Sequence, residues 1–195
     1  MKSFWNNRYA QDEYVYGIAP NQFFKEQLSL LPVGKLLLPA EGEGRNAVFA
    51  AKLGWDVTAF DNSEEALKKA MMLADNNGVH LDYSLNTFDD VSFKNESFDV
   101  IAFIYAHSPK WHSNHKKLLK YLKPNGTVLL EGFSKNQIDN KSGGPKQLEM
   151  LFSVSEIKED FNPLTHQKVW EEDVSLKEGK FHEGKASVIR MIGKK

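Results

Sequence analysis

The sequence predicts an α/β protein with a doubly wound, mostly parallel seven-stranded sheet and a C-terminal antiparallel hairpin. Two observations predict this fold. Apolar runs of strand length alternate with segments of helical period over residues 35–133, as is typical of parallel strands joined by crossover helices. After residue 165, the segments "HQKVWEEDVSL" and "KASVIRMIG" flank "KEGKFHEG", which indicates two strands joined by a turn.

Five apolar runs are the predicted parallel strands. Each is followed by a turn or a helical pattern, and the fourth, "FDVIAFIYA", has the continuous apolar character of a buried strand. The predicted strands cover residues 35–40, 55–61, 80–86, 98–106 and 127–133.

Helices are predicted between these strands from their apolar period and end signals. Asn62 followed by Glu65 resembles a capping box, and Ser153 with Glu156 repeats the pattern before a short helix. The expected helices end at Gly54, at residues 76–78, at the end of the amphipathic segment 114–122, and near Phe161.

Composition limits the classes of function. The 195 residues predict a single domain over 1–195, with 41% hydrophobic and 26% charged residues. A net charge of −1 does not indicate a basic surface that would bind nucleic acid or an anionic membrane. There is no cysteine, no signal-like N-terminus and no apolar run of the ~20 residues that span a bilayer. We expect a soluble, cytoplasmic protein that is a monomer or weak homodimer.

A glycine-containing loop, "LLLPAEGEGRN", follows the first predicted strand. Gly42 and Gly44 would let the backbone approach a ligand closely at the carboxyl end of the strand. Ala47 stands where a dinucleotide fingerprint requires a third glycine. Glu41 and Glu43 would repel a pyrophosphate and suit a positively charged ligand, such as an ammonium or a sulfonium.

An acidic residue ends the second predicted strand. Asp61 follows the glycine loop in a position where a carboxylate can accept both hydroxyls of an adenosine ribose. The alternative is that Asp61 caps the next helix beside Asn62.

The motifs "AEGEGRN", "VTAFDNSEEAL", "ESFDVIAFIYAH" and "LKPNGTVLLEGF" make the chain resemble a class I S-adenosylmethionine-dependent methyltransferase over nearly its whole length. Within this class, the chain most resembles the tellurite-resistance and thiopurine methyltransferase-like group. The resemblance implies a Rossmann-like fold, S-adenosylmethionine as cofactor, and in-line methyl transfer to a small thiol, chalcogen or other metabolite. It implies cofactor contacts from Ala40, Glu41, Gly42, Gly44, Asn46, Asp61, Asn62, Ser63, Thr87, Phe88, Asp89, Ile104 and Tyr105.

The chain departs from the class pattern in two places. Leu38 and Ala40 stand where the class has an acid and a glycine, and Glu41 is then the candidate for contact with the methionyl ammonium. After the third strand, Thr87 and Phe88 occupy the turn where an acid often touches the adenine, with Asp89 just beyond. Phe88 either packs on the adenine or belongs to the core.

Two segments are expected to close the pocket. Residues 1–30 form an aromatic flap that carries Trp5, Tyr9, Tyr14 and Tyr16, or a helix that packs these side chains on the sheet. Residues 134–152 lack periodicity and predict a lid shaped by Gly143, Gly144 and Pro145.

His107 follows the fourth predicted strand and is the candidate to polarise or deprotonate the acceptor, the alternative being a structural histidine. His112 and His115 lack a third ligand at recognisable spacing, so no metal is expected. Two other functions stay open. One is a nucleotide-cofactor oxidoreductase, and the other is a non-catalytic protein that binds S-adenosylmethionine.

Overall fold

A computed structural model describes residues 2–195 and contains a seven-stranded sheet in the order β3-β2-β1-β4-β5-β7-β6. The first five strands are parallel, and β7 is antiparallel to both β5 and β6. The predicted fold class is therefore confirmed. The strands are β1 (Lys35–Pro39), β2 (Asp56–Asp61), β3 (Asp82–Leu85), β4 (Phe98–Ile104), β5 (Leu122–Phe133), β6 (His166–Lys177) and β7 (Glu183–Lys194).

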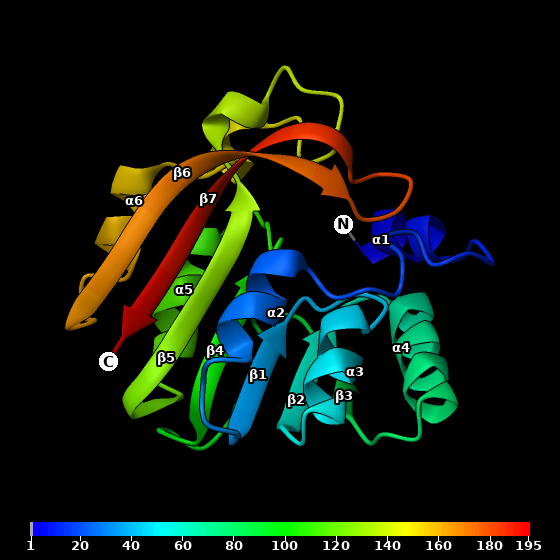
Figure 1. Cartoon of the computed structure of the whole chain (residues 1–195), viewed down its shortest axis with the longest axis horizontal. Coiled ribbons are helices and arrows are strands. Elements are labelled where there is room, and N and C mark those ends of the chain that lie inside the picture. Colours follow the sequence, from blue (N-terminus) through cyan, green and yellow to red (C-terminus); the bar gives the residue numbers. More distant parts are fainter. Residues whose placement is uncertain (1) are drawn as a thin grey trace.

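Helices cover both faces of the sheet (Figure 1). On one face lie α2 (Gln22–Leu28), α3 (Arg45–Lys52) and α4 (Glu64–Asn76), and on the other lie α5 (Trp111–Leu119) and α6 (Val154–Asp160). Strand β1 shows why its run is apolar throughout. Leu36 and Leu38 pack with α2 and α3, whereas Leu37 packs with α5 and α6, because successive side chains of a strand point to opposite faces.

Several element boundaries differ from the prediction, and three of the differences are larger or have a clear physical reason. Helix α5 begins at Trp111 rather than residue 114, and β5 begins at Leu122 rather than residue 127. The N-cap of α4 is Ser63, whose side chain accepts from the Ala66 N–H, so the capping box predicted at Asn62 was wrong by one residue. Serine and asparagine are equally good caps, and only the backbone path decides between neighbours.

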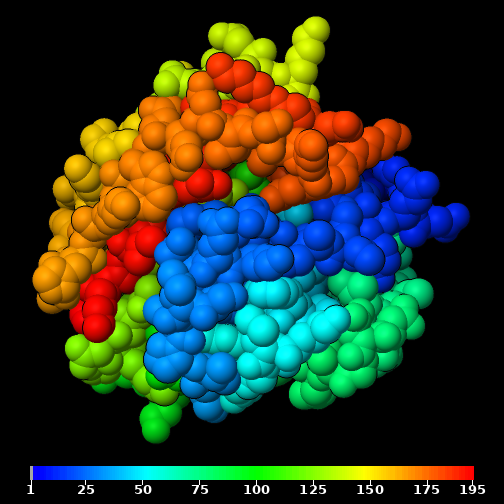
Figure 2. Space-filling model, in the orientation of Figure 1, coloured from blue at the N-terminus to red at the C-terminus, as the bar shows by residue number. Residues whose placement is uncertain are grey.

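The strand order reverses between β1 and β4, so a topological switch point lies at their carboxyl ends. Two segments from opposite ends of the chain meet above this edge. They are the N-terminal segment, which contains α1 (Lys2–Tyr9), and the turn of the β6–β7 hairpin (Figures 1 and 2). The segment between β5 and α6 contains two single turns, η1 (Lys135–Gln137) and η2 (Leu148–Met150). Over residues 2–195, no helix is long and apolar enough to cross a membrane.

Candidate functional site

The loop after β1 turns sharply at the switch point. Ala40, Gly42 and Gly44 have φ values of 52°, 68° and 87°. Ala40 thus keeps the left-handed backbone of the glycine that the class pattern has there, although a side chain disfavours this conformation. A Cβ on Gly44 would come within 2.7 Å of Ala70 on α4, so this glycine allows α3 and α4 to approach each other closely.

Glu41 in this loop caps the start of α3. Its Oε1 accepts from the backbone N–H groups of Asn46 and Ala47, both at 2.8 Å, and Oε2 accepts from Asn46 Nδ2 at 3.3 Å. Burial raises the pKa of Glu41 to about 7 against these hydrogen bonds. The carboxylate therefore faces the start of α3, and contact between Glu41 and a methionyl ammonium stays a prediction.

Asp61 lies at the carboxyl end of β2 beside the loop. Its two oxygens accept from Gly42 N at 3.1 Å and Ser63 N at 2.9 Å. Burial raises the pKa of Asp61 to about 6, against the backbone hydrogen bonds that lower it. The next residue, Asn62, has a buried side-chain oxygen without a hydrogen-bond partner.

Tyr83 joins this site from β3 and was missed by the sequence analysis. Its hydroxyl donates to the carbonyl oxygen of Gly42 at 2.6 Å. Burial raises its pKa well above the usual value, and the charges of Asp61 and Glu41 act in the same direction. A tyrosine in a short, half-polar strand carries no signal that it reaches across β2, so only the fold reveals it.

The N-terminal segment covers the glycine loop. The carboxylate of Glu43 accepts from Val15 N at 2.8 Å and pairs with Lys69 of α4, also at 2.8 Å. Tyr9 lies directly on Gly42, where an added Cβ would come within 2.8 Å of the Tyr9 hydroxyl oxygen. Trp5 stacks on Tyr9 with ring centroids 5.5 Å apart. Trp5 and Tyr9 therefore cover the loop and also pack against each other. The segment thus has features of both predicted arrangements, the aromatic flap and the packed helix.

Tyr14 and Tyr16 point in different directions. The Tyr14 hydroxyl donates to the carbonyl oxygen of Lys69 at 3.1 Å, so this ring anchors the segment to α4. Tyr16 instead packs on His182 of the hairpin turn, with ring centroids 4.5 Å apart. The same His182 ring contacts Tyr105 at 4.5 Å.

An ion pair links the glycine loop to the hairpin turn. Arg45, the first residue of α3, donates to Glu178 at 2.8 Å and to the Tyr16 carbonyl oxygen at 3.1 Å. Burial alone would raise the pKa of Glu178, but the hydrogen bond from His182 and the charge of Arg45 lower it to about 2. Both charged side chains of the pair are nearly inaccessible, at 8% and 12% exposure.

A second buried cluster continues from this pair. Asn21, the N-cap of α2, donates to Glu131 at 2.6 Å and to Glu178 at 3.0 Å. Glu131 at the end of β5 also accepts from Arg190 of β7 at 2.6 Å. Tyr105, directly after β4, has a buried hydroxyl without a hydrogen-bond partner. Its backbone is left-handed, with a φ of 52°. Sequence reasoning named Tyr105 but missed the polar residues around it.

The segment predicted as a lid packs on the hairpin turn. A Cβ on Gly143 would come within 2.3 Å of the Phe181 carbonyl oxygen, and one on Gly144 within 2.8 Å of the Phe133 ring. The half-buried Pro145 follows them. The lid, the hairpin turn and the N-terminal segment thus form one continuous cover, defined here as residues 2–16, 138–147 and 178–183.

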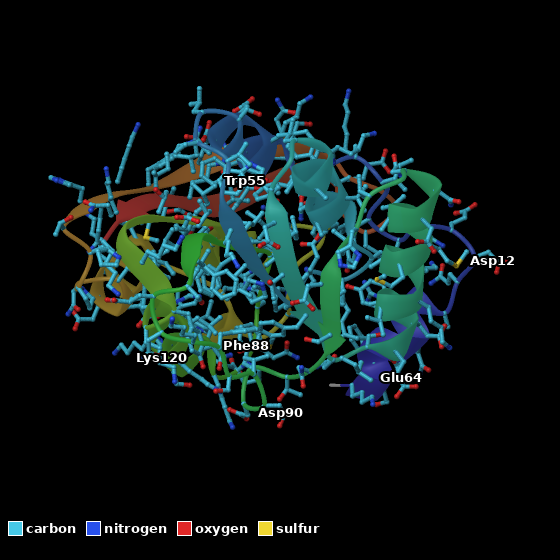
Figure 3. All side chains as sticks on the ribbon, turned by 90° about the horizontal axis from the view of Figure 1, so that it is seen from below. Asp12, Trp55, Glu64, Phe88, Asp90 and Lys120 are labelled. Carbon is cyan, nitrogen blue, oxygen red and sulfur yellow. The ribbon has the colours of Figure 1, made fainter. Side chains whose placement is uncertain are left out.

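The polar residues of the turn after β3 make their contacts at the protein surface. Thr87 donates to Asp90 at 2.6 Å, and Asp89 pairs with Lys110 at 3.0 Å with both side chains exposed. Phe88 packs edge-on against Phe60 at 5.3 Å. In Figure 3, Phe88 lies toward the interior, whereas Asp90 lies at the periphery. This arrangement favours the core interpretation of Phe88, and it gives Thr87 and Asp89 surface partners rather than a place at the loop.

His107 bridges three segments. Its Nε2 accepts from Phe133 N at 3.0 Å, and Nδ1 donates to the Met150 carbonyl oxygen at 2.8 Å. Burial lowers the pKa of His107 to about 4. Both ring nitrogens are therefore used, and this arrangement, which links the ends of β4 and β5 to the segment around Met150, favours the structural alternative for His107.

The two histidines of α5 share one carboxylate. Asp160 of α6 accepts from Nδ1 of His112 at 2.8 Å and of His115 at 3.0 Å. Over residues 2–195 no group of three or more histidine, aspartate or glutamate side chains has an arrangement that could hold a metal ion. Asp160 and the two histidines instead fasten α5 to α6.

The predicted cofactor residues divide into two sets. Ala40, Gly42, Gly44, Asp61 and Asn62 gather at the carboxyl ends of β1 and β2, with Ile104 and Tyr105 ending the neighbouring β4. Asn46 and Ser63 make structural hydrogen bonds instead. The Asn46 side chain bonds to Glu41 and to the Asn21 N–H, and Ser63 caps α4.

Comparison with known proteins relates part of the chain to methyltransferases. Residues 39–126 match a family model described as a methyltransferase domain. The chain is 37% identical over 106 residues to "Uncharacterized methyltransferase YbaJ" of Bacillus subtilis (strain 168), a match that covers 51% of this chain and 40% of that relative.

Solved structures resemble the whole fold. TehB from Haemophilus influenzae superposes with a TM-score of 0.70 at 16% identity, over 100% of this chain and 66% of that one. A SAM-dependent methyltransferase from Methanosarcina mazei gives a TM-score of 0.68 at 18% identity, over 91% and 98% of the two chains. At these identities the structural likeness shows the fold alone.

Proposed function

We propose that this protein transfers the methyl group of S-adenosylmethionine to a small-molecule acceptor. The observation that carries the proposal is Asp61, a buried carboxylate without a cationic partner among residues 2–195, held against the glycine loop at the switch point. Such a group favours a ligand that brings hydroxyl donors or positive charge. S-adenosylmethionine brings both, through its ribose and its sulfonium.

The residues present fit this cofactor. Asp61, held beside the loop by the Gly42 N–H, is placed to accept the hydroxyls of a ribose. The unpartnered oxygen of Asn62 supplies a further acceptor beside it. The bound cofactor supplies a methyl group activated by the sulfonium. The chain supplies alignment and the exclusion of water through its cover, and this is sufficient for an in-line displacement by a good nucleophile.

We propose a small thiol, chalcogen or related metabolite as acceptor. The cover closes the carboxyl edge with aromatic side chains, which supports a small molecule over a macromolecule. A solved structure titled "Conversion of a Disulfide Bond into a Thioacetal Group during Echinomycin Biosynthesis" has a TM-score of 0.72 at 16% identity, over 100% of this chain and 91% of that one. That title describes chemistry at sulfur, and the sequence resembles the tellurite-resistance group, so sulfur and chalcogen acceptors, including tellurite, are the first to screen. We propose that the protein works in the cytoplasm, as a monomer or weak homodimer.

Isothermal titration calorimetry tests the proposal directly. S-adenosylmethionine, S-adenosylhomocysteine and NAD⁺ are titrated into the wild type, Asp61→Asn, and the control Asp56→Asn at the exposed start of the same strand. We expect both adenosyl ligands to bind, with Asp61→Asn weakening them about 10- to 100-fold and Asp56→Asn leaving them unchanged. Binding of NAD⁺ alone would favour an oxidoreductase, and binding without methylation across a thiol, selenol and amine panel would favour a non-catalytic role.

A further inference from the structure

The Arg45–Glu178 ion pair is buried and has no part in the proposed contacts between Asp61 and the ribose. It joins residues 133 positions apart, one on the glycine loop and one on the hairpin turn. Burying two charges costs free energy that their attraction often fails to offset. A hydrophobic contact would close the hairpin turn at lower cost, so the retained pair points to a ligand that needs both charges.

The pair keeps unused hydrogen-bonding capacity. A guanidinium has five N–H donors, and Arg45 donates one hydrogen bond to Glu178 and one to the Tyr16 carbonyl oxygen. Beside the pair lies the Tyr105 hydroxyl, which is buried without a partner, on a residue held in the left-handed region. An orphaned buried hydroxyl and a strained backbone at one strand end are independent signs of a ligand site.

The cluster borders the ribose site. Arg45 follows Gly42 in the loop that Asp61 holds, and the charges of Asp61 and Arg45 both act on the phenol of Tyr9. The charges of Glu178 and Arg45 in turn act on the phenol of Tyr105. Asp61 and the ion pair therefore flank the same covered edge, one toward β2 and the other toward β4.

We propose that Arg45, Glu178 and Tyr105 bind the α-amino-acid head of the cofactor, an assignment that rests on the proposed function. The guanidinium receives the carboxylate, Glu178 receives the ammonium, and the Tyr105 hydroxyl hydrogen-bonds to the head between them. A zwitterion matches a preformed pair of opposite charges, because each ligand charge meets its complement and none is left unpaired. It follows that the hairpin turn, through Glu178, belongs to the cofactor site.

The test compares ligands with and without the head. Dissociation constants of S-adenosylhomocysteine, its decarboxylated analogue, and 5′-methylthioadenosine, which has no amino-acid head, are measured by calorimetry at pH 7.5. The variants are Arg45→Gln, Glu178→Gln and Tyr105→Phe. The controls are Asp173→Asn, an exposed residue of the same hairpin outside the cover, and Tyr121→Phe, whose hydroxyl contacts the Val91 carbonyl oxygen. Thermal unfolding is recorded for every variant.

The wild type is expected to bind S-adenosylhomocysteine at least about 100-fold more tightly than 5′-methylthioadenosine. Glu178→Gln and Tyr105→Phe should each reduce this ratio about tenfold while leaving 5′-methylthioadenosine unchanged. Arg45→Gln should abolish the preference for S-adenosylhomocysteine over its decarboxylated analogue. Equal weakening of all ligands, or an unchanged ratio in folded variants, would overturn the assignment alone. A wild type that binds none of the ligands would overturn the proposed function as well.

Discussion

The carboxylate of Glu43 accepts the backbone N–H of Val15 at 2.8 Å, and through this bond the glycine loop holds the N-terminal segment in place. Lys69 of α4 completes the anchor, since its ammonium donates to Glu43 at 2.8 Å and to the Glu13 carbonyl oxygen at 2.6 Å. The loop thus positions its own cover, and four further consequences of the structure are open to measurement.

Replacing Glu43 should release the N-terminal segment. Glu43→Ala leaves the buried Val15 N–H and the Lys69 ammonium without their shared acceptor, a loss of about 1–3 kcal/mol. We expect faster hydrogen exchange over residues 2–18, with β4 and β5 protected as before. Glu13→Ala, which keeps the backbone carbonyl bound by Lys69, is the matched control. Exchange that rises equally across the sheet would mean that Glu43 supports the core instead.

Ala40→Gly should stabilise the protein. Ala40 holds a φ of 52°, which costs a residue with a side chain roughly 1–2 kcal/mol, partly offset by the flexibility of an unfolded glycine. We expect a net gain of about 0.5–1 kcal/mol and a rise of about 2–4 °C in melting temperature. Ala47→Gly, inside α3, should lose about 1 kcal/mol. A destabilised Ala40→Gly would show that the methyl group has a packing role.

Stability should depend on the protonation of Glu41. Its folded pKa of about 7 lies above the usual 4.5, so the folded state binds more protons and the free energy of unfolding falls as the pH rises from about 4.5 to 7. Relative to Glu41→Gln, which keeps an acceptor for the Asn46 and Ala47 N–H groups, the wild type should lose up to about 3 kcal/mol between pH 5 and 8. Urea titrations at the two pH values measure the difference, and equal shifts in both proteins would contradict it.

The protonation of His107 should make stability depend on pH in the direction opposite to that of Glu41. Its folded pKa of about 4 lies below the usual 6.5, so the unfolded state binds more protons and the free energy of unfolding falls as the pH drops from about 6.5 to 4. His107→Gln preserves one donor and one acceptor for Met150 and Phe133. Relative to this variant, the wild type should lose up to about 3 kcal/mol between pH 7 and 4. An unchanged difference would imply that the ring is charged in the folded state.

Most of the fold could be predicted from local pattern. The apolar runs that became β1, β2 and β4 are continuous because helices cover both faces of those strands. Boundaries were less certain where several residues serve equally well, as at the cap of α4, where Ser63 and not Asn62 holds the helix start. The position of β7 between β5 and β6 carries no local signal, because strand order depends on pairing across the sheet.

The sequence by itself determined the glycine loop, Asp61 and the expectation of a cover, because backbone freedom, charge and aromatic density are properties of single residues and short motifs. Only the tertiary structure decided what those residues do. It turned Glu41 toward a helix start, gave both nitrogens of His107 to backbone groups, and brought Glu178 to Arg45. These outcomes depend on contacts between segments far apart in the chain, and burial then fixes which polar groups are paired and which remain available to a ligand.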